Sequence, residues 1–298
     1  ISFFNLFSYL STRTILSTLT SLLLVLIFGE GFIRLISSFQ FNQTFDGRAP
    51  ERHMVKHGTP TMGGILIVSS VLISGILWGN LFDKYLILGL ICIVGFAIIG
   101  FIDDYKKVKI ESSKGLSSIE KIFFQSILAG IISISLFMLA VDKNELIYIV
   151  PFFKNVALDL GIFFIFISIF IIVGSSNAVN LTDGLDGLAI LPVIIITSAL
   201  GIIAWAAGNV IASDYLYIPY VEDTGELLVL CGALVGAGIG FLWFNAYPAQ
   251  IFMGDVGSLS MGAFIAYIAI VVRHEIVFAV MSAVFVMEAL SVIIQVGS

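Results

Sequence analysis

Carboxylates interrupt the apolar sequence at three places where they could do chemistry. Asp103 and Asp104 are adjacent at the end of an apolar run, Asp183 and Asp186 lie three residues apart, and Asp255 has glycines close on both sides. Adjacent carboxylates repel each other unless a cation or a proton lies between them. The negative end of a helix dipole, where we expect Asp103 and Asp104, also favours a cation. Mg²⁺ prefers oxygen ligands of this kind, so the sequence predicts a magnesium site.

Lysines follow the first acidic pair and could meet phosphate oxygens. Lys107, Lys114 and Lys121 fit this role as well as they fit contact with anionic lipid headgroups, so both interpretations stay open. Acids alone would repel phosphate, whereas acids and lysines together suit a metal-bridged phosphate or pyrophosphate.

The stretch 175–189 carries two amides and two acids between apolar runs. A carboxylate at the centre of a bilayer costs about 2.5–3.5 kcal/mol, which favours a functional site over a structural role. We expect Thr182 or Asp183 to cap a helix that begins near Gly184, with Asp183 and Asp186 on one face of it. Asn177 and Asn180 supply amide groups that could read a base edge or sugar hydroxyls. In the stretch 244–258, Phe252 either stacks on a ring or anchors the loop at the membrane interface.

The stretch 52–64 admits two interpretations. Thr61, Gly63 and Gly64 could bring backbone amides close to an anion at a helix start, or the glycine pair could allow close packing between membrane helices. His53 and His57 are expected to be loop histidines and not metal ligands, because the sequence nearby offers no third ligand.

Composition places the chain in the membrane class. Of its 298 residues 59% are hydrophobic and only 11% charged, with a mean hydropathy of +1.11, whereas soluble domains carry roughly 25% charged residues. No basic run with interleaved aromatic residues suggests nucleic acid as a partner. Cys92 and Cys231 lie in apolar runs and are expected in the core, unpaired.

The apolar runs predict an all-α polytopic membrane protein with one domain spanning 1–298. They are continuous and do not alternate, which excludes barrel strands. We expect nine membrane helices, near 15–36, 61–80, 84–102, 122–140, 157–174, 188–208, 226–243, 259–272 and 276–296. The stretch 141–157 could form a small hairpin or a lid.

Lys and Arg set the expected orientation. Of the 14 basic residues, nine fall on the side of the gaps 37–60 and 103–121 and five on the other. The positive-inside rule makes the first side cytoplasmic and the N-terminus periplasmic. Helix parity then places 175–187 and 244–258 on the cytoplasmic side, so all the acid-bearing stretches face one compartment.

These stretches together resemble the phospho-N-acetylmuramoyl-pentapeptide transferase family, within the polyprenyl-phosphate N-acetylhexosamine-1-phosphate transferase superfamily. The resemblance rests on four motifs in the family's order, at 56–64, 100–105, 177–189 and 252–258. It implies Mg²⁺-dependent transfer of phospho-MurNAc-pentapeptide from UDP-MurNAc-pentapeptide to undecaprenyl phosphate, giving lipid I and UMP in peptidoglycan synthesis. It further implies a homodimer in the bacterial inner membrane, with the active site facing the cytoplasm.

The resemblance also implies roles for individual residues. Asp255 would be the principal Mg²⁺ ligand. Asp103 and Asp104 would be catalytic carboxylates, and Asp103 would deprotonate the lipid phosphate. The phosphates would meet Lys107 and Lys121, and the nucleoside end would be lined by Lys56, Asn177, Asn180, Asp183, Asp186 and Phe252. Direct attack by the lipid phosphate and a covalent aspartyl intermediate both stay open.

One departure and two alternatives accompany the resemblance. The family has ten membrane helices and a histidine-containing cytoplasmic loop before the last; the chain stops where that loop is expected, so we expect a truncated, weakly active form. A related transferase moving another HexNAc-1-phosphate is one alternative. An ion-coupled transporter is the other, although transporters often show inverted repeats, and none is visible here.

Overall fold

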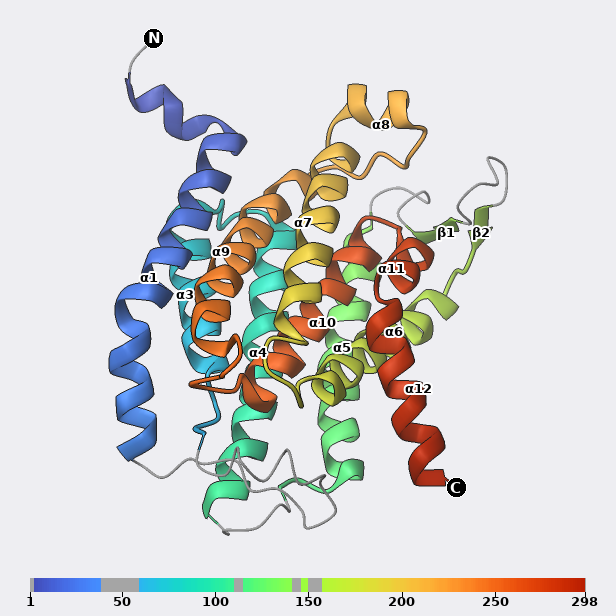
Figure 1. Cartoon of the computed structure of the whole chain (residues 1–298). Helices are drawn as coiled ribbons and strands as arrows, with labels where there is room; N and C mark the ends of the chain where they lie inside the picture. Colours follow the sequence, from blue (N-terminus) through green and yellow to red (C-terminus); the bar gives the residue numbers. More distant parts are fainter. Residues whose placement is uncertain (1–2, 39–58, 110–114, 141–145, 150–156, 298) are drawn as a thin grey trace.

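The computed structural model describes residues 3–38, 59–109, 115–140, 146–149 and 157–297 of the chain. These residues form a bundle of long helices with a two-stranded hairpin at one end (Figure 1). The elements in chain order are η1 (Phe3–Ser8), α1 (Leu10–Ser38), α3 (Gly64–Trp78), α4 (Lys84–Lys109), α5 (Ser118–Leu139), β1 (Ile147–Ile149), β2 (Ala157–Asp159), α6 (Phe163–Thr182), α7 (Ile190–Ala207), α8 (Val210–Leu216), η3 (Thr224–Glu226), α9 (Leu227–Asn245), α10 (Gly254–Val271), α11 (Glu275–Met281) and α12 (Ala283–Gly297).

Helix α10 is the centre of the bundle. Every residue from Asp255 to Val271 is buried, and α3, α4, α6 and α7 pack around the helix. Small residues allow this close approach: a β-carbon on Gly262 would collide with the backbone of α6 at Ser175 and Ser176. The hydroxyls of these two serines donate to backbone carbonyls of α10, at 2.8 and 3.0 Å. At Gly262, the absence of a side chain on α10 therefore lets the backbone of α6 approach closely.

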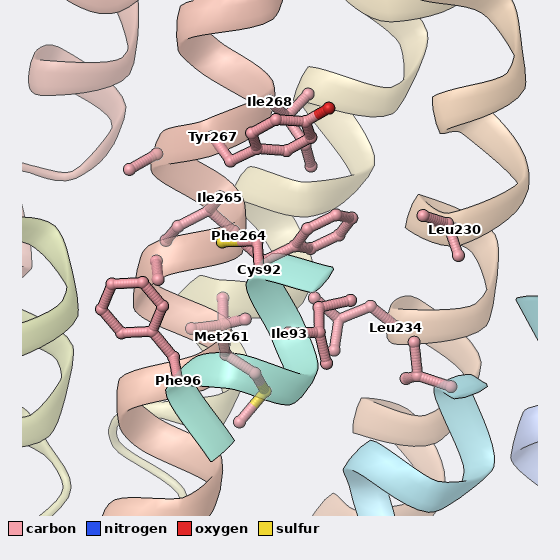
Figure 2. Packing of buried hydrophobic residues seen from close by; sticks show 14 of the residues in the cluster. Cys92, Ile93, Phe96, Leu230, Leu234, Met261, Phe264, Ile265, Tyr267 and Ile268 are labelled. Carbon is pink, nitrogen blue, oxygen red and sulfur yellow. The ribbon is translucent and has the colours of Figure 1, made fainter. Parts of the chain in front are cut away.

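Large apolar side chains fill the space where α4, α9 and α10 meet. Cys92 and Phe96 of α4 lie among Met261 and Phe264 of α10, with Leu234 of α9 close by (Figure 2). Both cysteines are buried and unpaired, as expected. The outer helices α6 and α7 also carry large apolar side chains on their outward faces, where Phe166, Phe170 and Ile202 are exposed. An apolar outer surface of this kind suits lipid, not water.

The all-α membrane class is confirmed. Among the described residues, seven helices are long and apolar enough to cross a membrane, and an eighth span results if the bent pair α11–α12 is counted as one. This pair bends by 71° at Ser282, and α3 is shorter, at 15 residues. Eight of the nine predicted segments each overlap one of these helices, and the ninth overlaps the bent pair α11–α12. The number of spans and the side of the N-terminus stay predictions.

Two expected boundaries are wrong at the polar stretches. Helix α6 continues through Ser175–Thr182, where a loop was expected, and α10 begins at Gly254, five residues before the expected start. Polar residues do not end these helices because a helix satisfies its own backbone hydrogen bonds wherever water is scarce. Of the two possibilities for 141–157, the hairpin is found: Ile147 pairs with Asp159 and Ile149 with Ala157 in an antiparallel ladder. The helix expected to begin at 157 therefore begins only at Phe163, after strand β2.

The polar stretches gather at one end of the bundle. The end of α4, the start of α5, the end of α6 and the start of α10 lie together, and the hairpin and α8 lie at the opposite end (Figure 1). The side chains with candidate chemistry therefore share one end.

Candidate active site

Three aspartates that are far apart in sequence converge at this end. Asp103 and Asp104 come from α4 and Asp255 from the first turn of α10; one carboxylate oxygen of each lies within 4.8 Å of the others. All three residues are buried, with at most 8% of their surface exposed. Three carboxylate groups offer only hard oxygen ligands, with no sulfur or nitrogen, and this fits Mg²⁺. For metal–oxygen distances of about 2.0–2.1 Å, the three oxygens would need to move only slightly toward one another.

Two lysines lie against the same oxygens. The Lys107 Nζ is 2.6 Å from the Asp103 Oδ2, 3.1 Å from the Asp255 Oδ2 and 3.6 Å from the Asp104 Oδ1. The Lys121 Nζ is 2.6 Å from the Asp255 Oδ2 and 3.7 Å from the Asp103 Oδ2. Lys107 extends from α4 and Lys121 from the first turns of α5. The cluster thus combines three negative and two positive side chains, the mixture of charges predicted for a phosphate-handling site.

Backbone contacts between glycines place Asp255 in the cluster. Gly254 has φ of +71°, in the region that favours glycine, and turns the chain into α10. Gly100 of α4 lies against the Asp255 carbonyl, and Gly64 of α3 lies against the backbone of Gly257, so a β-carbon at either position would collide. The expected tight turn around Asp255 is thereby found, with α4 and α3 packed directly on it.

The acidic pair lies inside α4, not at its end. The helix continues to Lys109, so the expectation that Asp103 and Asp104 end the helix is wrong, and with it the helix-dipole argument for a cation. Their carboxylates are fixed from outside α4 instead. The Asp103 Oδ1 accepts the Leu116 N–H at 2.6 Å, and the Asp104 Oδ2 accepts the Val256 N–H at 3.3 Å in the first turn of α10, where a helix favours negative charge.

The two asparagines have different positions. The Asn180 Nδ2 donates to the Asp255 Oδ1 at 2.7 Å and to the Ser258 Oγ at 2.8 Å, so Asn180 belongs to the cluster. The Asn177 Nδ2 donates to the Gln125 Oε1 at 2.6 Å and to the Val173 carbonyl, and links α6 to α5. Sequence reasoning missed Ser258 and Gln125. Ser258 could have been found, because it lies three residues after Asp255 and shares its helical face.

Asp183 and Asp186 hold the backbone of the loop before α10. They lie in the turn between α6 and α7 and do not share a helical face, and Asp183 ends α6 instead of capping a new helix, so both expectations are wrong. The Asp183 Oδ2 accepts the Gly254 N–H at 3.0 Å, and the Asp186 Oδ2 accepts the Ala249 N–H at 3.2 Å. Burial, with the negative charges of Asp255 and Asp104, raises the pKa of Asp183 well above its usual value.

The start of α3 favours the packing interpretation of its glycines. The Gly63 and Gly64 N–H groups donate to the Phe252 and Met253 carbonyls, at 2.9 and 2.8 Å. Because the chain itself satisfies these hydrogen bonds, the two amides do not face an anion. The Phe252 side chain is only 2% exposed, so in this structure it packs inside the protein and is neither open to a ligand ring nor an anchor at the membrane interface. Lys56, Lys114, His53 and His57 lie outside the described residues.

Comparison with known proteins agrees with this geometry. The sequence model of glycosyl transferase family 4 matches residues 86–273, which is more than half of the chain and includes every aspartate of the cluster. The chain belongs to this family. A second match, to phospho-N-acetylmuramoyl-pentapeptide-transferase signature 1, covers residues 56–68, where Gly63 and Gly64 open α3. Within glycosyl transferase family 4, that signature identifies the phospho-N-acetylmuramoyl-pentapeptide transferases.

Family membership confirms the resemblance to the phospho-N-acetylmuramoyl-pentapeptide transferases. As a member of glycosyl transferase family 4, the chain is a membrane-bound phosphoryl-sugar transferase that uses a nucleotide-sugar donor and a polyprenyl phosphate acceptor. The signature favours the muramoyl substrate over other HexNAc-1-phosphates. The transporter alternative is no longer supported, because the segment that carries the buried aspartates matches a transferase family.

Proposed function

We propose that the chain transfers phospho-MurNAc-pentapeptide from UDP-MurNAc-pentapeptide to undecaprenyl phosphate, forming lipid I and UMP for peptidoglycan synthesis. The observation that carries the proposal is the convergence of Asp103, Asp104 and Asp255 with Lys107 and Lys121 at one end of an apolar bundle. Such a site can hold a pyrophosphate next to the membrane, where the lipid acceptor is dissolved.

The reaction exchanges one phosphoanhydride bond for another. An oxygen of the lipid phosphate forms a bond to the phosphorus attached to the sugar, and the bond from that phosphorus to the bridging oxygen breaks. UMP leaves with the electron pair of the broken bond. Little covalent chemistry is required of the protein, so catalysis depends on positioning and on compensation of the phosphate charges.

The cluster residues have separable tasks in this proposal. Asp255 is the principal Mg²⁺ ligand, oriented by Asn180, and Asp103 and Asp104 complete the donor set. Bound there, Mg²⁺ supplies positive charge that offsets the developing charge on the phosphate oxygens. Asp103 accepts the proton of the lipid phosphate. Lys107 and Lys121 contact the phosphate oxygens of the donor.

The remaining polar residues shape the nucleoside end. Asp183 and Asp186 border the cluster through the loop before α10. Asn177, Lys56 and Phe252 complete the substrate-binding set that the resemblance implies; because the Phe252 side chain is buried, its contribution in this proposal is to support that loop from inside. The acid-bearing end faces the cytoplasm of a bacterial inner membrane in this proposal, because the nucleotide donor is made there. The excess of Lys and Arg on that side of the sequence supports the same orientation.

Radiolabelled donor tests the proposal. The purified protein is incubated in detergent with undecaprenyl phosphate and labelled UDP-MurNAc-pentapeptide. We expect label in the lipid fraction, release of one UMP for each lipid formed, and loss of both when EDTA removes Mg²⁺.

A parallel reaction with labelled UDP-GlcNAc identifies the sugar. Product from UDP-GlcNAc and none from the muramoyl donor would replace the proposed substrate by another HexNAc. Label that crosses sealed vesicles unchanged, with no lipid product, would contradict a transferase function.

A further inference from the structure

We propose that Lys107 and Lys121 act as exchangeable counter-ions of the metal site. They hold Asp103 and Asp255 together before the metal binds, and they move from these carboxylates to the substrate phosphates when it does. The inference deepens the proposed function and rests on Mg²⁺ binding at this cluster.

The distances show that the lysines and a metal ion need the same atoms. Both ammonium groups converge on the Asp255 Oδ2, at 3.1 Å for Lys107 and 2.6 Å for Lys121, and both also approach the Asp103 Oδ2. An Mg²⁺ ion bonds carboxylate oxygens at about 2.0–2.1 Å and prefers octahedral geometry. An ammonium group that stays at hydrogen-bond distance from the same oxygen would lie next to the divalent charge and be strongly repelled.

The charges explain why the chain needs counter-ions before the metal arrives. Asp103, Asp104 and Asp255 are buried within a few ångströms of one another, and three buried carboxylates without a cation would repel each other. Two lysines reduce the net charge of the cluster from −3 to −1. The site is therefore preformed by the lysines and does not depend on the metal to assemble.

The lysines have room and a destination for the exchange. About one third of the Lys107 side chain is exposed and 15% of the Lys121 side chain, so both reach the surface of the cluster. Lys107 lies on α4, one turn after Asp103, and Lys121 lies on α5, so the two side chains approach the cluster from different helices. We expect rotation of either side chain away from Asp255 to free its ammonium group for the phosphate oxygens of a metal-bound substrate. Metal binding and phosphate binding are thus coupled through the lysines.

Lysine methylation followed by mass spectrometry tests the exchange directly. Methylation by formaldehyde and a borane reports how accessible each lysine nitrogen is. The protein in detergent is treated without divalent ion, with Mg²⁺, and with Mg²⁺ plus UMP. We expect Mg²⁺ to raise methylation of Lys107 and Lys121 at least about threefold, and UMP to reverse the rise. Lys109, exposed at the end of α4, serves as the internal control and should not respond.

A second measurement uses Mn²⁺ in place of Mg²⁺, with binding followed by electron paramagnetic resonance. Lys107→Gln and Lys121→Gln should each bind Mn²⁺ about tenfold more tightly than the unchanged protein, because a competitor is removed. The matched control Lys109→Gln should differ by less than about twofold, since its charge lies outside the cluster.

The outcomes separate this inference from the proposed function. Normal Mn²⁺ binding with unchanged or reduced lysine methylation would overturn the exchange and leave the transferase proposal intact. Weaker Mn²⁺ binding by both glutamine variants would show that the lysines support the metal, and would also overturn it. Absence of Mn²⁺ binding in every protein would overturn the metal site itself, and the exchange with it.

Discussion

The backbone of Gly64 lies directly against the backbone of Gly257, with no space between them for a β-carbon. This contact joins the start of α3 to the first turn of α10, and the Gly64 N–H also donates to the Met253 carbonyl at 2.8 Å. The first motif of the chain therefore positions the last one: α3 sets where Asp255 points, although no side chain of α3 reaches the cluster through this contact.

Gly64→Ala is expected to destabilise the protein and to loosen the metal site. The added methyl group must push α3 from α10, and overpacking of this kind costs about 1–3 kcal/mol. Thermal unfolding in detergent should show a lower Tm, and Mn²⁺ affinity should fall as Asp255 moves. Gly174→Ala in α6 is the matched control, because its β-carbon meets nothing within 4 Å. A Gly64→Ala protein as stable as this control would contradict the backbone contact.

Asp255→Asn is expected to remove Mn²⁺ binding and to lower transfer of label at least about 10²-fold. The change preserves the shape of the side chain but removes the charge that a hard cation requires. Asp223→Asn controls for the loss of one carboxylate, because Asp223 is exposed before η3, at the opposite end of the bundle, and asparagine tolerates its positive φ of 68°. Normal turnover by Asp255→Asn would remove Asp255 from the metal site.

Asp183 is expected to act on the metal through the backbone of Gly254. Asp183→Ala leaves the Gly254 N–H without its acceptor, which costs about 1–3 kcal/mol, and should weaken Mn²⁺ binding roughly five- to tenfold. Asp183→Asn retains a carbonyl oxygen that can accept this bond, so it should keep most of the affinity. Equal losses in both variants would show that the charge of Asp183, and not its hydrogen bond, is what matters.

Asp83 should make stability depend on pH. Burial raises the pKa of Asp83 to about 6, although its carboxylate accepts the Leu86 N–H at 2.7 Å. Because an unfolded aspartate has a pKa of about 3.9, the folded state binds the extra proton between roughly pH 4 and 6. Stability is therefore lost as pH rises through this window, by about 2 kcal/mol or less.

Asp83→Asn isolates this contribution, since asparagine keeps an acceptor for the Leu86 N–H and does not titrate. The variant should have the higher Tm at pH 7, and the difference from the unchanged protein should disappear near pH 4. A Tm difference that is the same at both pH values would contradict the raised pKa.

Much of the site was predictable because membrane sequences make polar residues conspicuous. Asp103, Asp104 and Asp255 stood out against apolar runs, and Lys107 and Lys121 followed in the adjoining stretch, where a phosphate site needs positive charge. The structure brings these five side chains together at one end of the bundle. Their assignment as ligands and phosphate contacts stays a proposal.

The sequence by itself determined the membrane class, the positions of the helices and the end of the bundle that carries the acids, because apolar length and charge placement act locally along the chain. Only the tertiary structure decided which groups meet. Asp183 and Asp186 accept hydrogen bonds from backbone amides of the loop before α10. The Gly63 and Gly64 amides donate to the carbonyls of Phe252 and Met253. A hydrogen-bond partner from a distant helix leaves no periodicity in the sequence, so the difference between a ligand-facing polar group and one satisfied by the chain appears only when the helices are packed.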